Sequence, residues 1–382
     1  MAITERKAEK KSLLSKLLLI LNSIAILLLC FSYLSIFTNP NTFWLFSLCG
    51  IAYPYILLAN LIFIALWLII KRKYALYSLF FILIGYNQIG KFYQFSGKSR
   101  PDKKEDLFKV MSFNVRLFDL YNYNKDWSFN FEGRNQMFQF IRNESPDIAC
   151  FQEYFHDSSN QFCTTDSLKK ILNTTNFYTH YPQVIRKTDH YGIAIFSRYP
   201  ILNTGVIDFG KGTNNSAIFA DIQKGDKTIR VYNAHLQSIK FGKEDYAIAE
   251  NPDKNLNPKK NNDVNKTSKK ILYKLKQAFL LRAEQSEKVA KHISESPFPV
   301  ILCGDFNDTP TSYTYHKVSK KLTDCFVESG SGFGKSYAGK MPSFRIDYIF
   351  HDDHFRGYEF TTHQTIKASD HYPISVWLKL KK

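Results

Sequence analysis

Cysteine is scarce in this chain, and its six residues lack the paired C-x-x-C spacing typical of zinc and redox sites. The sequence therefore indicates neither a zinc site nor a disulfide framework. Cys150 and Cys303 lie inside apolar, strand-like runs, where we expect packed thiols rather than metal ligands. Internal repeats, glycine-rich nucleotide-binding loops and known nucleic-acid-binding modules are also absent, which argues against repeat scaffolds and nucleotide-loop enzymes.

Negative charge is almost missing from the first hundred residues. Residues 1–104 contain 13 Lys or Arg against 3 Asp or Glu, whereas residues 105–382 contain 38 against 31. More than half of the net charge of +17 therefore belongs to the N-terminal quarter of the chain. The remainder is a moderately basic soluble domain, whose excess charge either favours anionic partners or serves solubility alone.

Charge is absent altogether from residues 17–37 and 43–70, and both stretches are strongly apolar. Each is long enough to cross a bilayer, and a shorter stretch follows at 74–90. A cleaved signal peptide would not be followed by two further apolar stretches. We therefore predict a membrane anchor over residues 1–96 with about three transmembrane helices, a linker over 97–106, and a soluble domain over 107–382.

The basic flanks of these stretches predict their orientation. The basic residues Arg6, Lys7, Lys10 and Lys11 precede the first stretch, and the sequence "KRK" at 71–73 separates the second from the third. By the positive-inside rule both regions are cytoplasmic, and three spans then place the soluble domain on the outer, periplasmic side of the plasma (inner) membrane. Five basic residues between positions 91 and 104 run against this rule. If the third stretch only lies in the interface, the domain stays cytoplasmic.

The soluble domain alternates short strand-like runs with helical patterns. Strands are expected at 107–115, 147–153, 191–201, 228–236, 299–307, 344–350 and 372–380, and helices at 132–143 and 279–293. Most strand runs are apolar on both faces, as in sheets that are covered on both sides. This pattern predicts a layered α/β domain. Gly304, inside the apolar run that begins at Val300, marks a bend or a close approach of the backbone.

Polar residues of a narrow chemical range recur at the ends of these strands. They are Asn114, Glu153, His235, Asp305, Asn307, Asp347, Asp370 and His371. A single residue of this kind is usually a turn or a helix cap, but together they would form a site with four carboxylates, two imidazoles and two amides. Such a concentration of carboxylates would repel itself and raise their pKa values, unless a cation were bound. The oxygen-rich set points to Mg²⁺ or Mn²⁺.

The strand-end segments also occur in the order found in a known superfamily. They are "FNVR", "DIACFQE", "NAHL", "GDFND", "RIDYIF" and "SDHYP". From about Lys109 to Leu380 the chain resembles the endonuclease/exonuclease/phosphatase superfamily, the DNase I-like metal-dependent phosphoesterases. The superfamily includes nucleases, neutral sphingomyelinases and inositol-polyphosphate phosphatases. The resemblance implies a four-layered DNase I-like α/β sandwich with the site at one edge of two packed sheets.

The resemblance implies metal ligands at three of these positions. Glu153 is similar to the principal ligand, Asn114 assists it, and Asp370 supports a second metal position. Arg116 departs from the pattern, because the apurinic-endonuclease relatives have Asp two positions after the first Asn. The departure argues against abasic-site repair and leaves the number of metals open.

The other five residues match positions that act on the phosphate. Asp305 and Asn307 correspond to the residues that orient the attacking water and hold a phosphate oxygen. His371 corresponds to the histidine that faces the scissile phosphate, oriented by Asp347, and His235 to the second histidine of the nuclease and sphingomyelinase branches. Attack on a phosphodiester needs an activated water and neutralised phosphate oxygens, which such a set supplies.

These observations predict a membrane-anchored, Mg²⁺- or Mn²⁺-dependent phosphoesterase that hydrolyses phosphodiesters. Nucleic acid and phospholipid head groups remain equal candidates for the substrate, so the enzyme is either a nuclease or phospholipase C-like. The alternative is a catalytically inactive, membrane-tethered binding or scaffold protein. The presence of every carboxylate and both histidines argues against this alternative.

Two basic features stay open. Residues 239–276 are an apparent insertion, with eight Lys, two Asp and six Asn between 251 and 276. We expect a mobile, solvated loop there, or a segment that attracts a phosphate backbone or an anionic bilayer. Arg198, in the sequence "SRYPI", either reaches an anion or lies in a surface turn.

Overall fold

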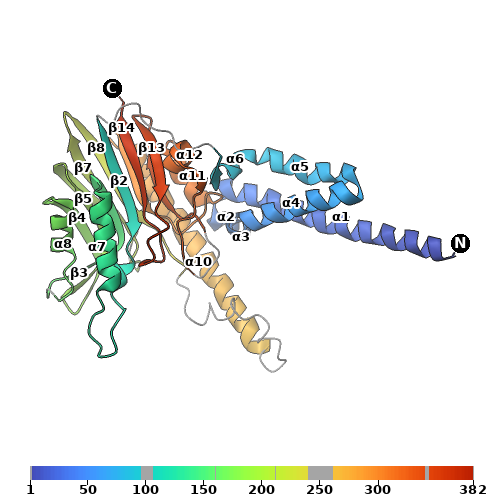
Figure 1. Cartoon of the computed structure of the whole chain (residues 1–382), viewed down its shortest axis with the longest axis horizontal. Helices are drawn as coiled ribbons and strands as arrows, with labels where there is room; N and C mark the ends of the chain where they lie inside the picture. Colours follow the sequence, from blue (N-terminus) through green and yellow to red (C-terminus); the bar gives the residue numbers. More distant parts are fainter. Residues whose placement is uncertain are drawn as a thin grey trace.

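A computed structural model describes residues 2–95, 106–159, 161–210, 212–239, 261–339 and 344–381 of the protein. An α/β domain forms one end of the molecule, and a bundle of N-terminal helices extends away from it (Figure 1). The N-terminus lies at the far end of the bundle. The predicted linker at 97–106 falls almost entirely outside the described residues.

The bundle contains fewer long helices than the sequence predicts. Its helices are α1 (Ala2–Phe37), α2 (Pro40–Phe43), α3 (Leu45–Ile51), α4 (Tyr53–Ile70), α5 (Ala75–Ile84) and α6 (Tyr86–Ile89), with a 3-10 turn at Arg72–Tyr74. Among the described residues, two helical segments are long and apolar enough to cross a membrane. They are Leu13–Phe37, with a mean hydropathy of 2.5, and Tyr53–Ile70, with 2.2.

The two other predicted spans are interrupted. The stretch 43–70 breaks at Ala52, because Pro54 stands in the first turn of α4 and favours a new helix start there. The stretch 74–90 breaks at Gly85 into α5, of ten residues, and α6, of four. The described bundle therefore has two candidate spans and a shorter helical return, instead of three continuous spans.

Two six-stranded sheets form the described part of the α/β domain. The first sheet has the order β10-β12-β9-β8-β7-β6 and the second the order β13-β14-β2-β3-β5-β4. The strands of the first are β6 (Ile201–Ile207), β7 (Ser216–Lys224), β8 (Lys227–His235), β9 (Val300–Asp305), β10 (Thr323–Asp324) and β12 (Asp347–His351). Those of the second are β2 (Leu107–Asn114), β3 (Ile148–Asp157), β4 (Asn176–Ile185), β5 (Asp189–Ser197), β13 (Phe355–Thr362) and β14 (Ile374–Leu380). A separate pair joins β1 (Tyr93–Gln94) to β11 (Gly332–Phe333).

Helices cover the outer faces of both sheets. Helices α7 (Glu132–Glu144) and α8 (Thr165–Leu172) pack on the second sheet, and α10 (Asn261–Ser294) and α11 (Tyr313–Ser319) pack on the first. A short helix, α12 (Cys325–Ser329), precedes β11. The inner faces of the sheets share one apolar core, which includes Cys150 and Cys303 as buried free thiols. The predicted α/β sandwich and the packed thiols are confirmed.

Parallel pairing brings the ends of β2, β8 and β9 and the middle of β3 to one edge of the sandwich. Strand β2 pairs in parallel with β3, and its last residue, Asn114, lies opposite Gln152 in the middle of β3. Strand β8 pairs in parallel with β9, and their last residues, His235 and Asp305, lie opposite each other. The second pairing depends on Gly304, whose φ is +156° and which lies opposite Ala234. A Cβ atom at Gly304 would lie 2.1 Å from the Ala234 carbonyl oxygen. The close approach predicted at this glycine is therefore confirmed.

The basic insertion differs from the prediction. Residues 261–276, expected as part of a loop, belong to α10, which runs without a break to Ser294. The packed half of the helix buries Ala278, Phe279, Ala283 and Val289 at the helical period, and the helix extends from this half back to Asn261. Residues 240–260 lie outside the described part of the chain.

The bundle joins the domain next to β9. Ser35 of α1 donates a hydrogen bond to the carbonyl oxygen of Thr311 at 2.6 Å, and Thr311 Oγ1 donates to the carbonyl oxygen of Gly50 at 2.7 Å. The ring of Phe37 packs edge-on against His316 of α11. The domain therefore rests on the end of the bundle that carries residues 35–50.

Candidate active site

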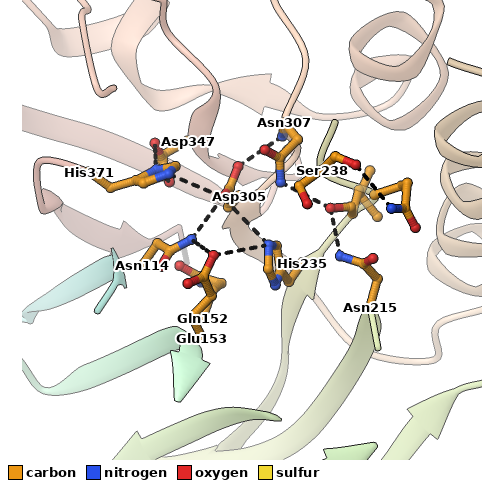
Figure 2. Close-up of polar contacts among 12 residues, drawn as sticks. Asn114, Gln152, Glu153, Asn215, His235, Ser238, Asp305, Asn307, Asp347 and His371 are labelled. Atoms are coloured by element: carbon orange, nitrogen blue, oxygen red, sulfur yellow. Dashed lines mark hydrogen bonds and ion pairs between the residues drawn. The ribbon is translucent and has the colours of Figure 1, made fainter. Parts of the chain in front are cut away.

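The predicted site residues come together at the edge where the parallel strands end (Figure 2). Asn114, His235 and Asp305 are the last residues of β2, β8 and β9. Asp347 begins β12, which runs antiparallel to β9, and pairs directly with Asp305. Chain direction and register thus place residues from distant parts of the sequence at one point.

Asp305 lies at the centre of this cluster and is 1% exposed. Its Oδ2 accepts a hydrogen bond from Asn114 Nδ2 at 3.0 Å and lies 3.7 Å from the Nε2 atoms of both His235 and His371. Burial raises the pKa of Asp305 to about 6, although both histidines work in the opposite direction. A carboxyl group with this pKa can accept a proton near neutral pH.

His371 is oriented by Asp347. Its Nδ1 lies 2.9 Å from one carboxylate oxygen of Asp347 and 3.1 Å from the other. Burial acts to lower the pKa of His371, but the carboxylates of Asp347 and Asp305 outweigh it and hold this pKa well above its usual value. The Nε2 atom of His371 therefore remains directed at Asp305 and the open edge of the site.

Glu153 reaches the site through a bulge in β3. The register of β3 with β5 shifts between Phe151 and Tyr154, and Glu153 adopts a φ of +47°. Such bulges redirect a side chain at the rim of a sheet. Asn114 Nδ2 lies 3.2 Å from Glu153 Oε1, and His235 Nε2 lies 3.9 Å from the same oxygen. Loss of water raises the pKa of Glu153, and the nearby His371 counteracts this rise.

Asn307 lies just beyond β9, in a left-handed conformation with a φ of +53°. Its backbone N–H donates to Asp305 Oδ1 at 2.8 Å, and its side chain donates to the Leu236 carbonyl oxygen at 3.0 Å. The guanidinium of Arg282, from α10, donates to the Asn307 carbonyl oxygen at 2.6 Å. Arg282 was not anticipated, because an arginine in a helix is usually a surface residue.

Asp370 occupies the rim of the site. Its side chain is 38% exposed, and the Arg116 guanidinium lies 4.0 Å away. The charge of Asp370 raises the pKa of Glu153, and the charge of Arg116 lowers it. Arg198, in contrast, pairs with Asp147 at 3.3 Å, before the start of β3. Because Asp147 lies just before β3 and six residues before Glu153, Arg198 belongs to a turn away from this site.

The donor set fits a hard divalent cation. Ligand atoms of Asp305, Asp347 and His371 lie within 4.8 Å of one another. The predicted metal ligands Asn114, Glu153 and Asp370 are not members of this triad. Asn114 contacts both Asp305 and Glu153, and the charges of His371 and Asp370 act on Glu153. Burial destabilises the ionised forms of Asp305 and Glu153, and a cation would reverse that effect.

Solved structures share this fold at low sequence identity. An endonuclease/exonuclease/phosphatase from Beutenbergia cavernae is 16% identical, with a TM-score of 0.51 and coverage of 72% of both chains. A second, from Bacteroides vulgatus, is 18% identical, with a TM-score of 0.50 and coverage of 72% of this chain and 99% of that one. No curated protein sequence matched the chain.

Two family profiles match the sequence itself. Residues 15–92, which include most of the bundle, match a domain of unknown function, DUF8431. Residues 111–371, from β2 to His371, match the Endonuclease/Exonuclease/phosphatase family, a family of divalent-metal-dependent hydrolases that act on phosphoester bonds. Since this second match spans more than half of the chain and contains every residue of the cluster, the protein belongs to the endonuclease/exonuclease/phosphatase family.

Proposed function

We propose that this protein is an integral membrane phosphodiesterase that uses Mg²⁺ or Mn²⁺ and whose catalytic domain lies on the outer side of the membrane. The observation that carries the proposal is the environment of Asp305, a buried carboxylate with an amide and two imidazoles directed at one of its oxygens. A structural carboxylate at the end of a strand has no need of two histidines.

The residues divide into two groups. Glu153, Asn114 and Asp370 would hold the metal, and the bound ion would supply positive charge to neutralise the phosphate oxygens. Asp305 accepts a proton from the attacking water, since its pKa of about 6 lies near the working pH.

The remaining groups act on the phosphate itself. His371 and His235 donate hydrogen bonds to phosphate oxygens, and Asp347 keeps the His371 ring in its working orientation. The side-chain amide of Asn307 donates one hydrogen to the Leu236 carbonyl oxygen, and its second hydrogen can be donated to the substrate.

The bundle supports membrane insertion because its polarity is the reverse of that of a soluble protein. Large apolar side chains are exposed along α1, α4 and α5, whereas Asn22, Asn60 and Ser78 are buried between these helices. Asn22 donates to Ser78 at 2.6 Å, and Ser78 donates to Asn60 at 3.0 Å. Helices in a bilayer associate through such buried hydrogen bonds while their apolar surfaces face lipid.

Hydrolysis by the full-length protein in nanodiscs tests this function. We expect cleavage of a soluble phosphodiester, and of either nucleic acid or phospholipid, that EDTA abolishes and Mg²⁺ or Mn²⁺ restores. Asp305→Asn should lower turnover by about 10²–10⁴-fold, because a general base is lost. The exposed Asp353→Asn is the matched control. Full activity after exhaustive chelation would overturn the metal assignment. No activity on any substrate would favour the inactive scaffold.

A further inference from the structure

Helix α10 crosses the domain-facing end of the bundle. Asn39 Nδ2 donates to Glu287 Oε1 at 3.2 Å, and eleven residues earlier the Lys276 ammonium lies 5.7 Å from the ring centroid of Trp44. Eleven residues are close to three helical turns, so Glu287 and Lys276 lie on the same face of α10. Asn39 and Trp44 flank the short helix α2, at the end of the bundle, so α10 runs across that end and then extends past it (Figure 1).

The face of α10 that meets Trp44 continues beyond the bundle. Tyr273 and Leu272 stand three and four residues before Lys276, and Lys269 stands seven before it, so all three share its face. Tyr273 is 63% exposed and Leu272 is 42% exposed. An apolar and aromatic patch next to exposed lysine thus lies on the bundle side of the helix.

The outer surface of the bundle is apolar as far as Trp44, the residue that α10 contacts. Phe43 and Leu45, on either side of Trp44, are 42% and 44% exposed. If the bundle lies in a bilayer, as the proposed function states, the head groups surround this end of it. The projecting half of α10 then lies against the head groups, with its apolar side chains toward the lipid.

We propose that residues 268–277 of α10 form an interfacial helix that binds anionic phospholipid head groups. Lysines accompany the apolar side chains along this segment, at positions 269, 270, 274 and 276. This combination of basic and apolar residues is typical of helices that lie in the plane of an anionic membrane surface. A tyrosine suits that depth, because its ring is apolar and its hydroxyl stays hydrated.

This contact would keep the active site beside the bilayer. Arg282, which holds the Asn307 carbonyl oxygen, follows Tyr273 by nine residues of the same helix, about 14 Å along its axis. One rigid helix therefore connects the lipid surface to the loop after Asp305.

Photo-crosslinking to lipid tests the proposal in the full-length protein. Benzoylphenylalanine replaces Tyr273 in nanodiscs of phosphatidylcholine with or without phosphatidylglycerol. The same group replaces Leu61, exposed on the bundle, in one control and Leu202, exposed on the edge strand β6, in another. We expect lipid labelling at 61 in both kinds of disc, at 273 chiefly in the anionic discs, and little at 202.

Charge reversal tests the role of the lysines. Lys269→Glu with Lys276→Glu should reduce labelling at 273 about tenfold while turnover on a small soluble phosphodiester stays unchanged. Lys170→Glu with Lys187→Glu, an equal change at exposed sites outside α10, should have no effect on labelling.

The controls separate this proposal from the proposed function. Absence of label at position 61 would refute membrane insertion of the bundle and this proposal with it. Label at 61 combined with background label at 273, or equal label at 273 in neutral and anionic discs, would refute the lipid contact alone. Preferential labelling of an added oligonucleotide at 273 would also overturn it, in favour of a nucleic-acid surface.

Discussion

Asp305 combines burial with a set of neighbours that determine its chemistry. Water is excluded from it, and hydrogen bonds from Asn114 and from the Asn307 backbone fix both of its oxygens. Burial alone would make the carboxylate too easily protonated, and the two histidines limit the rise of its pKa. A carboxyl group held in this way is suited to proton transfer.

Asp347 is a positioning residue in this scheme, because it acts on the phosphate only through His371. Asp347→Asn should lower kcat on a small phosphodiester by about 10²-fold or more, since the amide no longer fixes the ring or stabilises its charge. In a His371→Ala background the same change should have almost no further effect on kcat.

The kcat values of the wild type, both single variants and the double variant check this prediction. Thermal unfolding shows whether each variant is folded. If the two single effects multiply in the double variant, Asp347 acts on the reaction independently of His371.

Helix α10 has a structural task in addition to its proposed contact with lipid. Its buried Arg282 lies 3.2 Å from Asp308 and donates to the carbonyl oxygens of Gln237 and Asn307. These contacts hold together the segments that follow β8 and β9. The edge of the site therefore depends on a residue far from both strands in the sequence.

Arg282→Met should destabilise the domain by about 3–5 kcal/mol, because Asp308 would be left buried without its cation. Adding Asp308→Asn should restore part of the loss, since the amide carries no charge. Chemical denaturation of the three proteins measures both effects, with the exposed Glu284→Gln as the control on the same helix. A loss below about 1 kcal/mol would mean that water or a rearrangement replaces the ion pair.

At the scale of the whole molecule, the bundle separates basic residues from the catalytic domain. The N-terminal basic residues and the Lys71–Lys73 turn lie toward the end of the bundle away from the domain (Figure 1). The domain contacts residues 35–50 at the opposite end. If the bundle spans a membrane, as we propose, the first span sets the side on which the domain lies, whether or not α5 and α6 cross fully.

Because the basic end favours the cytoplasm, the domain should lie on the outer side. Alkaline phosphatase, which is active only outside the cytoplasm, should work when fused to the C-terminus of the full chain. Green fluorescent protein fused to the C-terminus should not fluoresce, because it would be exported with the domain. Green fluorescent protein fused to the N-terminus is the control and should fluoresce. Fluorescence of the C-terminal fusion would show a cytoplasmic domain.

Local patterns in the sequence were sufficient for the fold class and for naming the candidate site residues that the structure brings together. Strands such as β2, β3 and β9 are apolar on both faces, so their composition predicts that they are buried between two layers. Strands β4, β6 and β13 were missed because their residues are only partly buried and their patterns are mixed. Strand β7 was missed because Asp221 interrupts its apolar run. In the structure, Asp221 is paired with Arg230 of the neighbouring strand β8.

The way in which these residues meet depends on long-range packing. Asn114 and Asp305 are 191 positions apart, and parallel pairing within each sheet, followed by packing of the two sheets, brings their side chains to 3.0 Å. The bulge at Glu153, the burial of Arg282 and the path of α10 across the bundle depend on contacts between distant segments. Sequence determines which residues prefer burial or a strand end, whereas the geometry of a site depends on long-range packing that no local pattern encodes.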